Sequence, residues 1–283
     1  MKGKTTMATQ LSNNLITIFD SEVKHIYQSE GFTLDGTVRK KTGNAKTFKF
    51  PVYGSLRAEE HVPGQDALIQ NATQRQATVI ANDRRVVSAV DKFENLQVNY
   101  DDRQEAAKAQ AMAMGRDSDQ MIIDALAAST TTKAITEAST ASLTLAKLKQ
   151  AVEKMEEDEI DLGQCTYLGS YEEKQALLDE IKATSADYVS SRPLETGNFD
   201  GFLGIGKFIW IGKRAEGGLP VSSSKRKNFL WHHDAVGLGE VLNVQTRTDW
   251  DAKLGADLVQ SYYSAGAGEI DPTGIVSIEC YTS

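Results

Sequence analysis

The spacing of apolar and polar positions predicts one long helix between Tyr100 and Ser129. Asp101 or Asp102 can cap its first turn, because a carboxylate accepts hydrogen bonds from the N–H groups that are free there. Small and apolar residues then follow the three- and four-residue spacing of a single helical face: Ala107, Ala111, Met114, Ser118, Ile122 and Ala125. This face predicts close packing against a sheet or a second helix, and the opposite face is expected to carry Glu105, Arg116 and Asp119.

Gly115 lies near the middle of this helix. Glycine costs about 1 kcal/mol relative to alanine in a helix interior, so the sequence predicts a point at which the helix can bend. At about 1.5 Å per residue the helix would be about 40 Å long. It can therefore run the length of a domain.

The residues before the helix divide into an arm and an outward hairpin. Residues 1–44 contain few apolar clusters, so we expect an arm that is either mobile or packed on something else, including another subunit. From Lys46 to Val52 apolar and polar residues alternate, which predicts a half-buried strand, and Pro51 restricts that strand to a sheet edge. Ala77 to Ala81 predicts the returning strand. The long connection Gly54–Arg75 has no clear core face, which favours a protrusion.

Beyond the long helix the chain mixes helices and strands. Leu145 to Met155 has helical spacing, and Ser170 with Glu173 fits a capping box that opens another helix. Strands are predicted at Thr166–Leu168, Phe208–Ile211, Phe229–Trp231, Leu242–Thr248, Leu258–Tyr263 and Ile275–Tyr281. This order predicts an α+β fold with segregated helices and mainly antiparallel strands.

Composition narrows the class of protein. The 283 residues are enough for one large domain or two ordinary ones, and no apolar run approaches the length that spans a bilayer. A formal charge of −8 argues against general affinity for nucleic acid. The N-terminus lacks the pattern of a secretory signal, and Cys165 and Cys280 are far apart, so we expect a reduced protein inside a cell.

Charge is nevertheless distributed in blocks of opposite sign. One basic block comprises Arg39, Lys40, Lys41, Lys46 and Lys49, and a second comprises Lys213, Arg214, Lys225, Arg226 and Lys227. An acidic run lies between them, from Glu153 to Asp161. Such blocks are usually solvated faces, but they also suit a protein that binds copies of itself.

Motifs for catalysis are weak. Gly201–Lys207 matches the glycine-rich phosphate loop, but Phe208 replaces the required Ser or Thr and an apolar, strand-like run follows. His232 and His233 are adjacent, so on a strand they would point to opposite faces and could not easily share one metal ion. We therefore predict no catalytic, metal or cofactor-binding residues and no cofactor.

The order of the elements carries a resemblance, and three passages support it. Asn228–Gly239 ends in an Ala-x-Gly turn, and the later strands contain Tyr262–Gly268 and Gly274–Ile278. Together with the arm, outward hairpin and long helix, they resemble the major capsid protein of tailed double-stranded-DNA bacteriophages, whose fold is shared with encapsulins. The resemblance covers nearly the whole chain by layout.

The resemblance implies a domain plan within the tailed-phage major capsid fold. It gives an N-terminal arm (1–44), an extended β-hairpin loop (45–80), a spine helix (101–129), a peripheral domain (81–164 and 241–283) and an axial domain (165–240). It also implies a non-enzymatic shell protein that self-assembles into hexamers and pentamers of an icosahedral phage head enclosing DNA. The head would form in the cytoplasm of a bacterial host and become the virion capsid.

The expected partners are many copies of the chain, a separate scaffolding protein, a portal and packaged DNA bound without sequence specificity. No membrane is expected. The candidate subunit-interface residues are Arg39, Lys40, Lys41, Arg57, Glu59, Glu60 and Gly115, the last as a point where neighbours bend the helix. Since Gly54–Arg75 contains no lysine, the isopeptide cross-link of some relatives is not expected.

Two alternatives remain open at this stage. An encapsulin-like compartment would enclose enzyme cargo in place of DNA. A soluble nucleotide-dependent enzyme would use Lys207 in the glycine-rich loop.

Overall fold

A computed structural model provides the fold. It describes residues 29–61, 63, 66, 69–92, 95, 101–131, 133–136, 142–180 and 197–282. None of the helices in these ranges is long and apolar enough to cross a membrane. Most of the expected arm, residues 1–28, lies outside the described part.

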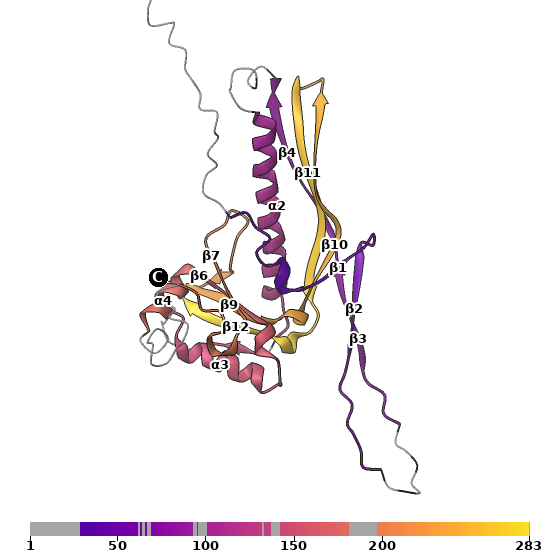
Figure 1. Ribbon diagram of the computed structural model, residues 1–283, viewed down its shortest axis with the longest axis vertical. Helices are drawn as coiled ribbons and strands as arrows, with labels where there is room; N and C mark the ends of the chain where they lie inside the picture. Colours follow the sequence, from indigo (N-terminus) through magenta and orange to yellow (C-terminus); the bar gives the residue numbers. More distant parts are fainter. Residues whose placement is uncertain are drawn as a thin grey trace, which may run out of the picture.

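An elongated layer of one helix on one sheet forms the upper part of the molecule (Figure 1). Helix α2 (Asp102–Ala127) lies along a sheet with the strand order β1 (Arg39–Thr42), β10 (Val236–Asp251), β11 (Ala256–Glu269) and β4 (Asn82–Asp91). Gln110 fixes the helix to the sheet, because its side chain donates to the Val259 carbonyl at 2.9 Å and accepts from Ser261 Oγ at 2.8 Å. Ser118 Oγ lies 3.1 Å from the Tyr263 hydroxyl on the same strand.

The predicted long helix is confirmed, with Asp101 as its N-cap accepting from the Arg103 N–H. The prediction of its polar face is wrong. Asp119 has no exposed surface, and the side chain of Arg116 is 12% exposed. The helix is covered by β11 on one side, and by the segments around Leu34 and Arg214 on another. A single apolar stripe therefore did not describe its burial.

A second sheet builds a lobe beside the lower end of α2, shown in Figure 1. Its strand order is β5 (Ala134–Ile135), β12 (Ile275–Tyr281), β9 (Lys225–His232), β6 (Cys165–Ser170) and β7 (Lys207–Ile211), and β8 (Val221–Ser222) pairs with β9. Two helices pack on it, α3 (Leu145–Glu156) and α4 (Tyr171–Asp179). The predicted capping box of Ser170 and Glu173 at the start of α4 is confirmed.

Short 3₁₀ turns join these elements: η2 (Asp35–Thr37), η3 (Leu162–Gln164), η4 (Phe202–Gly204), η5 (His233–Ala235) and η6 (Pro272–Gly274). Of the nine strand pairings among the described residues, six are antiparallel and three parallel. This agrees with the expected α+β fold of mainly antiparallel strands.

The lobe extends beyond the range 165–240 that the sequence suggested. Strand β12 pairs with β9 along its length, and α3 shares a buried core with β6 and β12. The sequence had grouped both elements with the peripheral part, within 81–164 and 241–283. Adjacent positions in the chain could not reveal that the terminal strand crosses back into the lobe.

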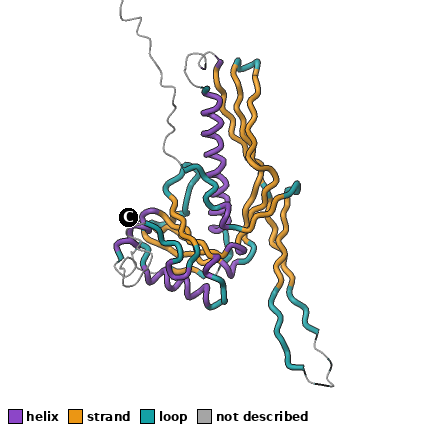
Figure 2. Tube along the Cα trace, viewed as in Figure 1, coloured by secondary structure: helices purple, strands orange, loops and turns teal. Residues whose placement is uncertain are grey.

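The hairpin of β2 (Thr47–Tyr53) and β3 (Gln74–Ile80) projects away from both layers (Figure 2). Before it, residues 29–44 pack on their own chain, since Leu34 and Val38 are buried and β1 pairs in parallel with β10. The sequence missed β1, because all four residues of Arg39–Thr42 are on the exposed side and show no apolar alternation.

Replacing Ile278 of β12 by Ala should lower the free energy of unfolding by about 2–5 kcal/mol, since the side chain is fully buried in the lobe. The same substitution at Ile80, which is 56% exposed, should change it by less than about 0.5 kcal/mol. Urea denaturation of both variants measures the difference. Equal effects would place β12 outside the core of the lobe.

Candidate functional site

Four glycines form a flat surface at the base of the hairpin, which we call the hairpin seat. Gly237 and Gly239 lie in β10, and they pair directly with Gly268 and Gly266 of β11. These glycines belong to the passages Asn228–Gly239 and Tyr262–Gly268. The structure places them inside strands, where they leave backbone exposed to the hairpin.

Aromatic side chains of the hairpin pack on that bare backbone. Phe48 and Phe50 are 4% and 3% exposed and share a core with Val79. A Cβ atom at Gly239 would lie 2.3 Å from the Phe48 ring, and one at Gly237 would lie 2.9 Å from Phe50. Any side chain at the seat would therefore displace the root of the hairpin.

The far end of the hairpin has no such cover. Leu56 is 61% exposed and Ile69 is 87% exposed. The predicted interface residues Arg57, Glu59 and Glu60 are exposed here, and Gln70 donates to Glu59 Oε1 at 3.0 Å. The hairpin thus has a fixed root and, beyond its strands, exposed apolar side chains at Leu56 and Ile69.

A second set of contacts, which we call the helix clamp, joins α2 to the segment between β7 and β8. Arg214 Nη1 donates to Asp119 Oδ2 at 2.7 Å, and Arg116 Nε donates to Glu216 Oε1 at 2.9 Å. One turn further along, Gln120 Oε1 accepts from the Gly218 N–H at 2.7 Å. Successive turns of the helix are therefore bound to the lobe.

The N-terminal segment completes the clamp. The Leu34 N–H donates to Asp119 Oδ1 at 2.9 Å, and the Phe32 N–H donates to the Gly115 carbonyl at 3.1 Å. A Cβ at Gly115 would lie 2.4 Å from the Glu30 carbonyl oxygen. Gly115 thus permits close approach of the N-terminal segment, and α2 continues through it as one helix. That neighbouring subunits bend α2 at Gly115 stays a prediction.

Burial makes the Asp119–Arg214 pair sensitive to the loss of either partner. The side chains are 0% and 6% exposed. Removing two charges from water is costly, and the cost is offset only while each charge faces the other. The pair therefore fixes how the lobe, α2 and the N-terminal segment lie relative to one another. Sequence reasoning missed it, although Gly115, Asp119, Ile123 and Leu126 form a second stripe along the helix.

The predicted basic interface residues lie beside the hairpin seat. Lys40 Nζ is 2.7 Å from Glu240 Oε2 and 3.1 Å from Asp35 Oδ2. Burial disfavours the charged amine, but these hydrogen bonds outweigh it and raise the pKa of Lys40. Lys41 Nζ donates to the Lys49 carbonyl at 3.3 Å, whereas Arg39 is exposed. Lys40 and Lys41 thus make contacts within their own subunit.

The chemical motifs of the sequence have structural roles here. Lys207 is exposed at the start of strand β7, whereas a phosphate loop would lead into a helix. His232 Nδ1 accepts from the Asp234 N–H at 3.2 Å, and the described residues contain no group of three metal-ligand side chains. Cys165 and Cys280 are free, and burial raises the pKa of each thiol to about 12. These thiols are therefore poor nucleophiles at neutral pH.

Comparison with known proteins places this arrangement in a family. A family model described as phage capsid protein matches residues 11–282. No curated protein matches the chain.

Solved structures share the fold. The capsid of Helicobacter pylori bacteriophage KHP30 is 13% identical, with a TM-score of 0.78 and 99% of each chain covered. A structure of Mycobacterium phage Che8 is 16% identical, with a TM-score of 0.72, covering 94% of this chain and 97% of its own. The capsid of cyanophage P-SCSP1u is 13% identical, with a TM-score of 0.72, covering 98% and 96% respectively. At these identities the likeness concerns the fold alone.

Replacing Gly239 by Ala should lower the free energy of unfolding by about 1–3 kcal/mol, because the added methyl group overlaps the Phe48 ring. Gly36→Ala is the control, since a Cβ there meets nothing within 4 Å. Urea denaturation compares the two, and adding Phe48→Leu should restore part of the Gly239→Ala loss. A loss at Gly239 no larger than at Gly36 would contradict the hairpin seat.

Replacing Asp119 by Ala should lower the free energy of unfolding by about 3–5 kcal/mol, because Arg214 keeps a buried charge without its partner. Asp124→Ala removes an exposed carboxylate from the same helix and should cost less than about 0.5 kcal/mol. Adding Arg214→Ala to Asp119→Ala should recover part of the loss. Strictly additive effects in this double-mutant cycle, measured by urea denaturation, would show that the two side chains are not coupled.

Proposed function

The chain belongs to the phage capsid protein family and is a structural, non-enzymatic shell protein of a phage head, and we propose that it assembles as hexamers and pentamers of an icosahedral shell around double-stranded DNA. In this proposal α2 is the spine helix, the β2–β3 hairpin is the extended loop, and residues 1–44 are the arm. The lobe around β6, β7 and β9 is the axial domain. The rest of the α2 layer is the peripheral domain.

The contrast between the two ends of the hairpin carries the proposal. Its root is held in the hairpin seat by buried aromatic rings, whereas Leu56 and Ile69 at the other end are largely exposed. Exposed apolar side chains on a projecting segment invite association. A rigid root directs that association to one position on a neighbouring copy, which is what a regular shell requires.

Self-association by this route closes into rings. A hairpin that reaches from one subunit onto the next makes a head-to-tail contact, and such contacts form closed rings when the rotation between subunits closes. Many copies of a weak contact then sum to a stable container. Arg57, Glu59 and Glu60 are placed to pair with charges on the neighbouring copy.

Sequence and charge bear on two further parts of the proposal, the absence of cross-links and the contact with DNA. The segment Gly54–Arg75 contains no lysine, so we propose a shell held without covalent cross-links. The net charge of −8 limits adhesion of packaged DNA to the wall, which suits contact without sequence specificity. A separate scaffolding protein and a portal complete the proposed assembly in the cytoplasm of the bacterial host.

Electron microscopy of the chain expressed with its scaffolding protein tests the proposal. Wild type should form closed shells, and a Leu56→Asp/Ile69→Asp variant should remain as free subunits with an unchanged circular dichroism spectrum. Leu56→Val/Ile69→Val keeps both positions apolar and should still form shells. Shells from the aspartate variant would remove the hairpin tip from the interface, and a ladder of covalent multimers on a denaturing gel would contradict the non-covalent shell.

A further inference from the structure

Strand β10 leaves most of its outer edge without a neighbouring strand. β1 pairs with it only at residues 237–240, and the described residues place no other strand on that side. The pairing with β11 has two register shifts before Gln245 and is regular from there to Asp251. Residues 245–251, which we call the open edge, contain no proline, and 245–250 are exposed. They therefore offer backbone N–H and C=O groups to a further strand.

The open edge also carries charges that its own subunit does not neutralise. Among the residues that the structure describes, none forms an ion pair with Arg247 or Asp249. Both stand opposite alternate residues of β11, Gln260 and Leu258. These alternate with Ser261, whose side chain bonds to α2, so both charges lie on the other face of the sheet.

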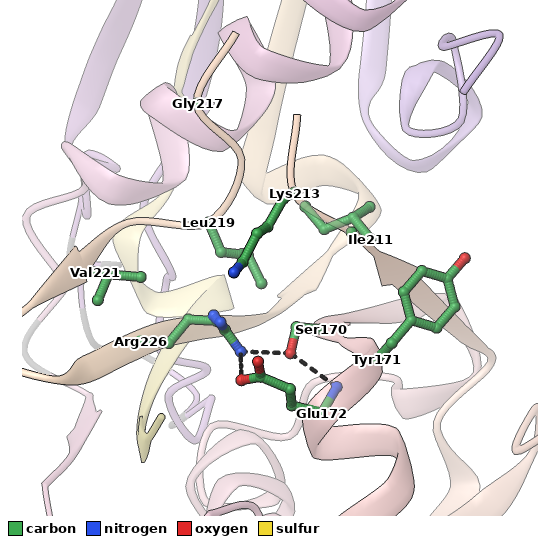
Figure 3. A pocket seen from close by; sticks show the side chains of 10 residues that line it. Ser170, Tyr171, Glu172, Ile211, Lys213, Gly217, Leu219, Val221 and Arg226 are labelled. Carbon is green, nitrogen blue, oxygen red and sulfur yellow. Dashed lines mark hydrogen bonds and ion pairs between the residues drawn. The ribbon is translucent and has the colours of Figure 1, made fainter. Parts of the chain in front are cut away.

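The charged cavity of the lobe differs in this respect. It has a volume of about 270 Å³, and Arg226 lies at its wall. In Figure 3 this guanidinium donates to Ser170 Oγ and to Glu172, the latter at 2.8 Å. These charges bind within their own chain, whereas those of the open edge are available to a second molecule.

The sequence of the open edge is complementary to itself. In an antiparallel pair, two facing residues either both bond across or both do not, so a strand that pairs with its own copy is centred on one residue. A centre at Arg247 or Asp249 puts a charge opposite the same charge, and a centre at Trp250 puts Asp249 opposite Asp251. A centre at Thr248 puts Arg247 of each copy opposite Asp249 of the other. Among centres from 245 to 251, only this one forms Arg–Asp pairs without opposing two like charges.

We infer that the open edges of two copies pair as antiparallel strands about a two-fold axis at Thr248. Opposite charges that face each other across strands stabilise a sheet, and so do pairs of β-branched and aromatic side chains. The register supplies the second kind as well, because it puts Thr246 opposite Trp250, which is 53% exposed. Each copy uses the same patch, as a two-fold contact requires.

This contact goes beyond the one proposed for the hairpin and does not use it. A head-to-tail contact closes subunits into rings, whereas a two-fold contact joins two subunits through identical surfaces. The open edge can therefore link a subunit of one ring to a subunit of the next. It lies on the part of β10 that continues past β1, along the α2 layer of Figure 1.

Single-cysteine trapping in the full-length protein tests the register. Thr248→Cys puts two thiols opposite each other at the axis, so mild oxidation should give a disulfide-linked dimer on a non-reducing gel. Thr246→Cys is the matched control, since it is exposed in the same strand but its two copies would lie four residues apart, about 14 Å, beyond the reach of a disulfide. Cys165 and Cys280 are buried and do not compete. A dimer yield from Thr248→Cys no higher than from Thr246→Cys would overturn the inference.

A charge exchange tests the ion pairs. Adding Arg247→Asp to Thr248→Cys should slow dimer formation at least about fivefold, because two ion pairs become two like-charge contacts. Adding Asp249→Arg as well restores both pairs in reversed order and should restore the rate. Arg85→Asp makes the same change of net charge on the other edge strand, β4, and should leave the rate unchanged. A charge-exchanged variant as slow as Arg247→Asp would overturn the Arg–Asp pairing.

Electron microscopy of the same samples separates this inference from the proposed shell. Shells without the Thr248→Cys dimer would overturn the edge contact and leave the shell in place. Dimers without shells would support the edge contact and count against the shell. Circular dichroism confirms that each variant is folded.

Discussion

The buried carboxylate of Asp119 is the interaction on which the arrangement of this subunit depends. One oxygen accepts from the Leu34 N–H and the other from Arg214, so a single side chain joins α2, the N-terminal segment and the lobe. A buried charge without its partner is strongly unfavourable, so each of the three parts is held in a narrow range of positions. The subunit can therefore present its surfaces to neighbours in a fixed relation.

The hairpin seat extends the same constraint to the projecting part. The glycines of β10 and β11 let Phe48 and Phe50 contact backbone directly, and this close contact aims the hairpin. Packed interiors do not deform continuously, so a hairpin with a buried root swings little. Beyond its strands the hairpin carries the exposed apolar side chains of Leu56 and Ile69. A repeating contact between copies needs a projection that is held in one direction and has side chains free to bind. The buried root and the exposed side chains of this hairpin meet both conditions.

The interior of the lobe explains why the chemical motifs of the sequence carry no reaction. The glycine-rich loop before Lys207 turns the chain into an edge strand, and the two cysteines lie in apolar surroundings that keep their thiols protonated. Strand β12, near the end of the chain, pairs with β9 in the same sheet. The chain therefore returns from β11 of the α2 layer to the lobe, which links the two parts a second time. These residues stabilise the subunit, and the surfaces carry its function.

Local patterns in the sequence determined the long helix, its acidic cap at Asp101 or Asp102, the capping box at Ser170 and the hairpin strands. Each of these follows from neighbours within a few residues, through backbone hydrogen bonds and side-chain periodicity. The burial of Asp119, the packing role of Gly115 and the parallel pairing of β1 depended on segments about 85 to 200 residues distant in the chain. Only the tertiary structure decided these, because a charge or a glycine takes its role from the surface it meets, and a single sequence does not state which surface that is.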